Sequence, residues 1–400
     1  MKPDQRSVLA VALAALLASS GTQASVSDDQ VKIGVLADMG GVYADVCGPG
    51  CVTAVEMAVE DFGGSVLGKP ITIVSADDQN KPDVGSAKVR EWVEDDQVDM
   101  VTGLVSSAVT GAATQVLTAK KKIALITGSA SNAFTTKACS PYTAHWTYNV
   151  VALANGTVKP MVQSGKKKWF FITADYAFGH ALEGVASKVV NGNGGEVVGA
   201  VRAPLGTTDF SSYVLQAQAS GADVVALANA GGDFVNALKT AAEFGLTETA
   251  DVAGLLVFTA NAQALDPSIA AGMKLTTGFY WDMDEETRAW SARFKARHGS
   301  IPSMVHAGVY SATHHYLNSI KASGSDDSDI VMKQMKSTQP SDFFARKATL
   351  RADGRLIHDM YQVRIKKSSE RQSRDDIYAV EKVVSGEQAY APMLSQCAFR

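Results

Sequence analysis

Short runs of consecutive apolar residues alternate along the chain with longer segments in which apolar residues recur every three or four positions. A continuous apolar run is typical of a strand buried on both faces of a sheet, and the helical period is typical of a crossover helix. The alternation therefore predicts βαβ units, which build parallel sheets. In the first part of the chain we expect strands at residues 31–36, 71–74, 100–101 and 123–126, and helices at 52–62, 84–93 and 107–119.

The same alternation starts again after about residue 150. Two sets of βαβ units in one chain predict two similar α/β lobes. The later helical segments, at residues 285–298 and 305–321, have to pack on one of those lobes. In the second set we expect strands at residues 169–172, 197–198 and 224–227, and helices at 181–190, 213–219 and 234–244.

The N-terminal residues have the pattern of a secretory signal peptide. Lys2 and Arg6 give a short basic region, residues 8–18 are apolar, and Thr22-Gln23-Ala24 resembles a cleavage site. The apolar run is too short to span a bilayer, which needs about 20 residues. The sequence therefore predicts that residues 1–24 are removed and that the mature protein is soluble and periplasmic.

Composition and charge exclude several classes of protein. Of the 400 residues, 46% are hydrophobic and 20% are charged, which is ordinary for a globular chain. The formal net charge of -4 argues against a nucleic-acid partner, because such proteins usually carry a basic domain or stripe.

The four cysteines suit an exported protein, because disulfides persist outside the cytosol. Four cysteines allow three pairings, and the sequence alone does not choose between them. Cys47 and Cys51 flank the tight-turn sequence Gly48-Pro49-Gly50, which favours a Cys47–Cys51 bond together with Cys139–Cys397. A metal or thiol site is disfavoured, since the chain has no CxxC pair and no histidine near these cysteines, and we expect no metal and no cofactor.

The turns that follow the predicted strands are where a ligand is expected, because open α/β sheets bind at the carboxyl ends of their strands. The turns at residues 103–107 and 127–132 offer small hydroxyl side chains and free backbone N–H groups. Those are the groups that hold a carboxylate beside a positive helix end. The turn at residues 174–179 offers aromatic side chains from the other lobe. The alternative is that Ser107 and Ser131 only cap helices.

These features resemble the leucine/isoleucine/valine-binding family of periplasmic solute-binding proteins, the type I class that feeds ABC importers. The resemblance covers about residues 30–365 and depends on the order and spacing of many weak motifs. Its carriers are Gly40-Gly41-Val42-Tyr43, Ala58-Val59-Glu60-Asp61, residues 103–107, 128–135, 175–179, 209–211 and 221–225, and the late residues Phe294, Arg297, Gly299, Pro302, Ala307 and Tyr310.

The resemblance implies an α/β fold of two doubly wound parallel-sheet lobes joined by a hinge of three crossovers, the type I periplasmic binding protein fold. Lobe one would hold residues 30–148 and 282–345. Lobe two would hold residues 149–281 and 346–400. The two lobes would close on a ligand like a hinged trap.

The resemblance also implies a ligand site. In the family, lobe one holds the carboxylate of the ligand through hydroxyl and backbone N–H groups, which here match Ser107, Ser129 and Ser131, with Ser129 acting mainly through its backbone. Val105 and Ser106 lie in the same turn as Ser107. Phe178 matches an aromatic residue that covers the ligand from lobe two, and Tyr43 lies in the loop that touches the ligand side chain. Cys47 departs from the family, which tends to place an aromatic residue near that position.

A second departure concerns the ligand's amine. Amino-acid binders of the family use an acid shortly after the strand that matches residues 253–258, but this chain continues Thr259-Ala260-Asn261-Ala262. Ala230 stands where the family has a tyrosine. A buried ammonium without a partner costs several kcal/mol. Either Asp233 or Asp175 supplies the negative charge that pairs with the ligand's ammonium, or the ligand has no ammonium.

Two of these residues have an alternative role. Asp233 also fits a helix N-cap or a first-turn charge, and the sequence favours this structural role. Tyr280 ends a predicted strand near a crossover, where it lines the cleft or packs in the hinge.

The resemblance implies a binding protein that captures a small carboxylate-bearing solute, such as an amino acid or an aromatic acid, and delivers it to ABC permease subunits in the inner membrane. We expect a monomer that is not an enzyme. A ligand sensor of the same fold is the first alternative. An exported α/β enzyme is the second, and it is disfavoured because no nucleophile and base stand at a recognisable spacing.

Overall fold

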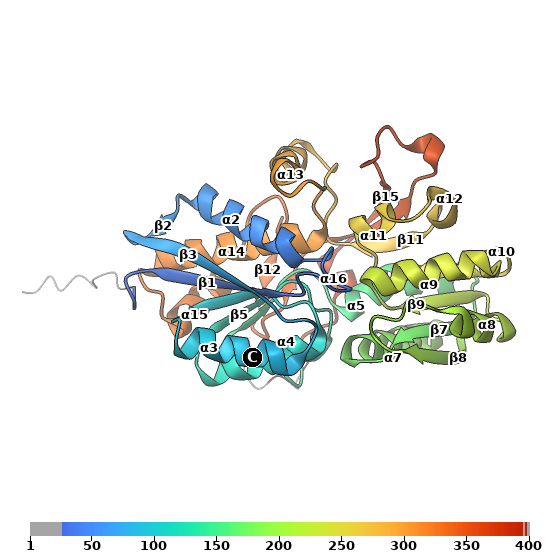
Figure 1. Cartoon of the computed structure of the whole chain (residues 1–400), viewed down its shortest axis with the longest axis horizontal. Helices are drawn as coiled ribbons and strands as arrows, with labels where there is room; N and C mark the ends of the chain where they lie inside the picture. The colour runs from blue at the N-terminus through green and yellow to red at the C-terminus, as the bar shows by residue number, and fades with distance from the viewer. Residues whose placement is uncertain (1–25, 395–396, 398–400) are drawn as a thin grey trace, which may run out of the picture.

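The computed structural model describes residues 26–394 and Cys397 (Figure 1). The signal peptide predicted at residues 1–24 lies outside the described residues. In Figure 1 the molecule is elongated, with β1–β5 and their helices at one end and β7–β9 and their helices at the other. The two α/β lobes predicted from the sequence are confirmed.

The first lobe is built on a six-stranded sheet with the order β2-β3-β1-β4-β5-β6. Its strands are parallel except for the short hairpin between β2 and β3. In the register of the sheet, Ile33 of β1 lies opposite Ile73 of β3 and Met100 of β4. The strands are β1 (Val31–Ala37), β2 (Ser65–Val66), β3 (Lys69–Asp77), β4 (Met100–Gly103), β5 (Ile123–Ile126) and β6 (Thr143–His145).

Helices cover both faces of this sheet, as the apolar strands require. Ile33 and Val35 of β1 belong to the core cluster that includes α2 and α14, whereas Leu36 packs with α3 and α4 on the other face. The late helices lie on this lobe, because α13 and α14 contact α2, and α15 contacts α14. The helices are α2 (Gly48–Phe62), α3 (Pro82–Glu94), α4 (Ser107–Ala119), α13 (Glu285–His298), α14 (Met304–Ser323) and α15 (Ser328–Ser337), with a 3₁₀ turn at Asn132–Thr135.

The second lobe is built on a four-stranded parallel sheet with the order β10-β9-β7-β8. Phe171 of β7 packs with α7 on one face, and Phe170 and Ile172 pack with α8 and α9 on the other. The strands are β7 (Lys168–Ala174), β8 (Glu196–Ala203), β9 (Val224–Ala228) and β10 (Asp251–Gly254). The helices are α5 (Val150–Leu153), a π-helical segment (Ala154–Val158), α6 (Lys159–Gln163), α7 (Ala177–Gly192), α8 (Ser211–Ala219), α9 (Gly231–Glu243), α10 (Leu246–Thr249), α11 (Thr259–Gln263) and α12 (Pro267–Ala270).

A smaller antiparallel sheet, with the order β11-β14-β15, follows the second lobe. The chain passes between the two lobes after β6, between β11 and α13, and again after α15, which gives the three crossovers of the expected hinge. The remaining elements are β11 (Lys274–Thr277), β12 (Thr349–Leu350), β13 (Leu356–Ile357), β14 (Met360–Ile365), β15 (Tyr378–Val384), α16 (Gly386–Ala389) and a 3₁₀ turn at Ser368–Glu370.

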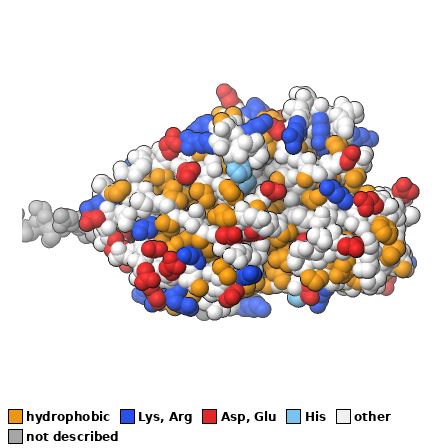
Figure 2. Space-filling model, in the orientation of Figure 1, with side chains coloured by type: hydrophobic (Ala, Val, Ile, Leu, Met, Phe, Trp, Pro, Cys, Tyr) orange, Lys and Arg blue, Asp and Glu red, His pale blue; other side chains and the backbone are white. Residues whose placement is uncertain are grey.

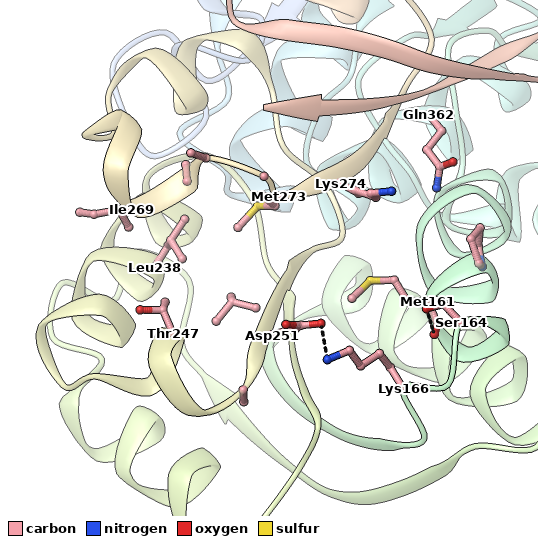
Figure 3. Close-up of a pocket in the computed structure, with 16 residues that line it drawn as sticks. Met161, Ser164, Lys166, Leu238, Thr247, Asp251, Ile269, Met273, Lys274 and Gln362 are labelled. Atoms are coloured by element: carbon pink, nitrogen blue, oxygen red, sulfur yellow. Dashed lines mark hydrogen bonds and ion pairs between the residues drawn. The ribbon is translucent and has the colours of Figure 1, made fainter. Parts of the chain in front are cut away.

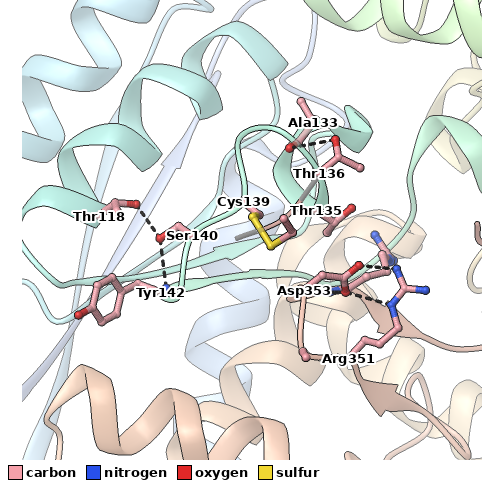
Figure 4. The surroundings of a disulfide bond; sticks show 12 residues. Thr118, Ala133, Thr135, Thr136, Cys139, Ser140, Tyr142, Arg351 and Asp353 are labelled. Atoms are coloured by element: carbon pink, nitrogen blue, oxygen red, sulfur yellow. Dashed lines mark hydrogen bonds and ion pairs between the residues drawn. A yellow bond between two sulfur atoms is a disulfide. The ribbon is translucent and has the colours of Figure 1, made fainter. Parts of the chain in front are cut away.

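Two disulfides connect the cysteines in the pairing that the sequence favoured. Cys47 and Cys51 are joined at the start of α2, with their Cα atoms 4.9 Å apart. Cys139 and Cys397 are joined with their Cα atoms 5.7 Å apart, which attaches the C-terminal segment to the first lobe (Figure 4). Within the described part of the chain, no group of His, Cys, Asp and Glu is placed to hold a metal ion.

Side chains of both charges are interspersed on the face shown in Figure 2, with hydrophobic side chains between them. No single-sign stripe crosses that face. Among the described residues, no helix is both long and apolar enough to span a membrane.

Candidate ligand-binding site

A narrow cavity, with room for about one water molecule, lies between the two lobes. The first lobe, the crossover after β6 and the second lobe all contribute to its wall. Its lining residues are Tyr43, Val46, Val105, Gly128, Ala130, Tyr148, Tyr176, Phe178, Ala230, Leu256 and Phe258. Tyr43, Val105, Phe178 and Ala230 are among the site residues named from the sequence.

The cavity lies where parallel strands of both sheets end, which is the expected place for a ligand in α/β folds. In the first lobe, Val105 follows β4, and Gly128 and Ala130 follow β5. In the second lobe, Tyr176, Ala230 and Phe258 immediately precede α7, α9 and α11. Helix N-termini carry partial positive charge, so the elements around the cavity favour an anion.

Two glycines bring the turns of the first lobe together. Gly103 has a φ of +87°, and a Cβ atom there would lie 2.6 Å from the Leu36 carbonyl oxygen. A Cβ atom on Gly128 would lie 2.7 Å from the Val105 side chain. Only glycine allows this packing, which places the turn after β4 against the turn after β5.

The serines of these turns are buried in the first lobe. Ser107 Oγ and Ser129 Oγ lie 2.7 Å apart in a hydrogen bond. Ser106 Oγ is buried without a hydrogen-bond partner among the described residues, and it does not cap α4. The first turn of α4 therefore keeps N–H groups available beside a cluster of hydroxyl groups.

Ser131 has a different role from that of its neighbours. Its Oγ accepts a hydrogen bond of 3.3 Å from the Ala133 N–H and so caps the 3₁₀ turn that follows. This is the capping role that the sequence left open for Ser131. The structure therefore bonds Ser107 to Ser129, leaves the Ser106 hydroxyl without a partner among the described residues, and gives Ser131 a local partner. None of these four serines is among the residues that line the cavity.

Tyr43 is held in the cavity wall by a buried acid. The Asp38 carboxylate accepts hydrogen bonds from the Tyr43 N–H at 2.9 Å and from the Gly41 N–H at 2.6 Å. The Tyr43 hydroxyl lies 2.7 Å from the Tyr176 hydroxyl of the second lobe. Burial raises the pKa of both tyrosines, so both hydroxyls stay protonated and can donate.

The backbone also joins the lobes beside this pair. The Gly232 N–H donates to the Val42 carbonyl oxygen at 3.1 Å. Gly231 has a φ of +61°, and a Cβ atom there would lie 2.4 Å from the Val42 carbonyl oxygen. The start of α9 therefore contacts the Tyr43 loop directly, and the lobes are closed around the cavity.

Neither acid considered for the ligand's amine lines the cavity. Asp233 is buried, and its carboxylate accepts from the Gly206 N–H at 3.1 and 3.2 Å. Burial raises the pKa of Asp233 to about 6. Asp175 is half exposed and lies 2.8 Å from the His180 ring.

Tyr280 does not line this cavity, which corrects one of its two expected roles. Its hydroxyl accepts hydrogen bonds from the Ile377 N–H at 2.9 Å and the Tyr378 N–H at 3.2 Å. Its ring lies 5.3 Å from the Tyr378 ring. Tyr280 therefore fixes the start of β15, which is the packing role that the sequence left open.

Seven lining residues were not among the sequence candidates: Val46, Gly128, Ala130, Tyr148, Tyr176, Leu256 and Phe258. Tyr176 lies in the aromatic turn at residues 174–179, so the turn itself signalled it. Leu256 and Phe258 were assigned to a strand at residues 253–258, but β10 ends at Gly254. Tyr148 lies in a crossover, where no periodic pattern marks a residue.

A buried cation stands behind Tyr148. Arg355 is fully buried and donates to the backbone carbonyl oxygens of Trp146 at 2.8 Å and Tyr148 at 2.9 Å. Its guanidinium lies 4.3 Å from the centre of the Tyr390 ring. Within the described residues, the Arg355 guanidinium forms no ion pair. The nearby carboxylate of Asp353 pairs with Arg351 instead, at 2.6 Å. An arginine stays charged when buried, so the crossover side of the cavity has a positive charge behind it.

A larger hollow of about 460 Å³ lies elsewhere in the second lobe, between β10 and β11 (Figure 3). Met161, Leu238 and Met273 point into it, and Lys166 pairs with Asp251 at 3.0 Å on its edge. None of the site residues named from the sequence lies there. We therefore place the candidate site in the smaller cavity, which both lobes enclose.

Comparisons with known proteins agree with this architecture. The model of a family described as periplasmic binding protein matches residues 30–371. A solved periplasmic binding protein from Burkholderia mallei is 46% identical, with a TM-score of 0.91, over 93% of this chain and 99% of that chain. A branched chain amino acid ABC transporter periplasmic ligand-binding protein from Burkholderia xenovorans LB400 is 39% identical, with a TM-score of 0.82, over 92% of this chain and 100% of that chain.

A curated relative matches over a shorter stretch. Leu/Ile/Val-binding protein homolog 6 of Brucella abortus (strain 2308) is 26% identical over 216 residues, which is 54% of this chain. The match spans 55% of that relative, so the chain spans about half the length of the curated relatives it matches.

Proposed function

The chain belongs to the periplasmic binding protein family, and from this we propose that it captures a small carboxylate-bearing solute between its lobes and delivers it to the permease of an ABC importer. The observation that carries the proposal is the cavity that both lobes enclose. Ligand contacts to both lobes would favour the closed state over the open one, because a ligand shifts an equilibrium toward the state it binds better.

We propose the carboxylate subsite at Ser106, Ser107 and Ser129. Three features support it: the hydroxyl pair of Ser107 and Ser129, the unpartnered hydroxyl of Ser106, and the uncapped first turn of α4. Hydrogen bonds to a charged group are worth about 1.5–3 kcal/mol each, which is enough to hold a carboxylate without a cationic side chain.

We propose the lobe boundaries given from the sequence, residues 30–148 and 282–345 against residues 149–281 and 346–400, except that the tail at Cys397 stays with the first lobe, to which its disulfide with Cys139 holds it. The packing of α13 and α14 on α2 supports placing the late helices with the first lobe. On this division Tyr43 and Tyr176 belong to opposite lobes.

Binding without catalysis is the role that the site chemistry supports. The buried hydroxyl of Ser107 is bonded to Ser129 and not to an imidazole. His145 Nε2 lies 2.7 Å from the Ser129 carbonyl oxygen, and burial holds the pKa of His145 well below its usual value. A neutral imidazole bound to a carbonyl has no nucleophile to activate.

The test is thermal unfolding of the exported protein, lacking residues 1–24, with a panel of small carboxylates and uncharged amides. A ligand at 100 times its Kd adds about 2.7 kcal/mol of stability. Each added kcal/mol raises the midpoint temperature of unfolding by roughly 2–4 °C for domains of this size. A shift with a carboxylate that the double variant Ser107→Ala/Ser129→Ala abolishes supports the proposal. A shift only with uncharged solutes contradicts it.

A further inference from the structure

We propose that the solute is a small carboxylic acid without an ammonium group, whose second polar group is a neutral oxygen, as in an oxo or hydroxy acid. This inference rests on the proposed function, because it assumes that a carboxylate-bearing solute occupies the cavity between the lobes.

The wall of the cavity has no group to neutralise an ammonium. It consists of aromatic rings, aliphatic side chains and small residues, and among the described residues no Asp or Glu lines it. An ammonium held there would lose its water shell without gaining an opposite charge. That desolvation is among the largest penalties in protein interiors, so the wall selects against amines.

Three acids of the surrounding turns are engaged in other contacts, and Asp78, whose buried Oδ2 has no partner among the described residues, does not line the cavity. Asp233 is bound to the Gly206 N–H, and Asp175 is at the surface with His180. The Asp38 carboxylate holds the backbone of the Tyr43 loop. Each acid would have to break these hydrogen bonds and turn toward the cavity to meet an ammonium.

The charge behind the wall has the wrong sign for an amine. Arg355 donates to the carbonyl oxygen of Tyr148, which lines the cavity, and has no acid paired with it in the described chain. In a medium of low dielectric constant an unpaired charge acts over several ångströms. The Arg355 guanidinium therefore attracts a carboxylate and repels an ammonium.

The hydroxyl pair at the boundary of the lobes suits a neutral oxygen. Tyr43 and Tyr176 bond to each other at 2.7 Å, which uses one hydroxyl hydrogen. The other hydrogen is left to donate to the solute. A carbonyl or hydroxyl oxygen accepts that hydrogen, whereas an ammonium has no lone pair with which to accept it.

The experiment compares acids of the same carbon skeleton that differ only at the amine. Isothermal titration of the exported protein uses 3-oxobutanoate against 3-aminobutanoate, and 4-methyl-2-oxopentanoate against leucine. We expect the oxo acid of at least one pair to bind at least 100-fold more tightly than its amine.

A second arm introduces the missing charge. Ala230 lines the cavity and precedes α9, and aspartate is favoured at a helix N-cap, so Ala230→Asp should fold. We expect Ala230→Asp to weaken oxo-acid binding at least tenfold and to strengthen amine binding. The matched variant Ala230→Asn, of the same size but neutral, should leave the amine as weak as in the wild type.

The outcomes separate this inference from the proposed function. An amine that binds the wild type as tightly as its oxo acid overturns the inference and leaves the binding function in place. If Asp233→Asn then lost the binding of that amine, Asp233 would be the acid that pairs with the ammonium. The inference is also overturned if the ratio of oxo-acid affinity to amine affinity is the same in Ala230→Asp and Ala230→Asn. Failure of every acid to bind, with or without an amine, contradicts the proposed function itself.

Discussion

The hydroxyls of Tyr43 and Tyr176 lie 2.7 Å apart and form a hydrogen bond between the two lobes at the edge of the cavity. Tyr43 comes from the loop before α2, and Tyr176 is the residue before α7. Beside them, the Gly232 N–H donates to the Val42 carbonyl oxygen. Closure is therefore stabilised by contacts between the lobes as well as by whatever the cavity holds.

Removing one hydroxyl of this pair should weaken ligand binding without altering the fold. Tyr176→Phe keeps the ring that lines the cavity but loses a hydrogen bond worth about 0.5–1.5 kcal/mol. Because the bond exists only in the closed state, we expect the ligand Kd to rise about two- to tenfold, measured by calorimetry. Tyr213→Phe, on α8 outside the cavity, is the control and should leave the Kd unchanged. An unchanged Kd in Tyr176→Phe would show that the hydroxyl pair does not contribute to closure.

A single methyl group at the start of α9 should prevent closure. A Cβ atom on Gly231 would lie 2.4 Å from the Val42 carbonyl oxygen, and the φ of +61° adds strain for any other residue. We expect Gly231→Ala to weaken binding at least tenfold and to leave a larger radius of gyration in X-ray scattering with ligand present.

Gly232→Ala is the matched control for that variant, because its Cβ atom would lie 3.3 Å from a Val42 methyl group that can move. It should bind within about threefold of the wild type. Equal binding by the two variants would mean that the Val42 contact is not needed for closure.

The serines should divide into two groups. Ser107→Ala and Ser129→Ala each remove a hydroxyl from the bonded pair, and we expect each to weaken carboxylate binding by about 1–3 kcal/mol. Ser131→Ala removes the cap of the 3₁₀ turn, so it should lower stability by about 0.5–2 kcal/mol with little effect on affinity. Calorimetry and urea unfolding on the three variants measure the two effects separately. A larger loss of affinity in Ser131→Ala than in Ser107→Ala would contradict this division.

Asp233 should make stability depend on pH. Burial raises its pKa from 3.8 to about 6, so the folded state holds a proton that the unfolded state releases. The contribution of this group is most favourable below pH 3.8 and is lost as pH rises through about 6. Asp233→Asn keeps an acceptor for the Gly206 N–H and should be more stable than the wild type at pH 7, by roughly 2–3 kcal/mol.

Urea unfolding at pH 4 and pH 7 measures this effect, and the two proteins should differ less at pH 4. The surface variant Asp175→Asn is the control and should follow the wild type at both values. If Asp233→Asn gained the same stability over the wild type at both pH values, the Asp233 carboxyl of the wild type would not titrate in this range.

The architecture followed from the sequence because its signals are local. The apolar runs that became β1, β4, β5, β7 and β9 are buried on both faces, and turns after β4, β5 and β7 reach the cavity. The family resemblance, now confirmed, added the hinge of crossovers between the two lobes.

Residues whose role depends on long-range packing were harder to predict. Tyr148 lines the cavity, and its backbone carbonyl is held by Arg355, more than 200 positions later in the chain. Leu256 and Phe258 are apolar and continue the run that forms β10, so nothing local shows where that strand ends. Tyr280 and Phe178 are both aromatic residues near strand ends, and only the partners of Tyr280 in β15 distinguish them.

The Cys139–Cys397 bond closes a covalent ring that spans 258 positions and contains the whole of the second sheet. Both ends of that ring are attached to the first lobe. A protease that cuts a loop anywhere within the ring therefore leaves two fragments joined by sulfur, which migrate together on a non-reducing gel and separate after reduction. A protein of this design tolerates a nick in its moving lobe without losing that lobe to the surrounding medium.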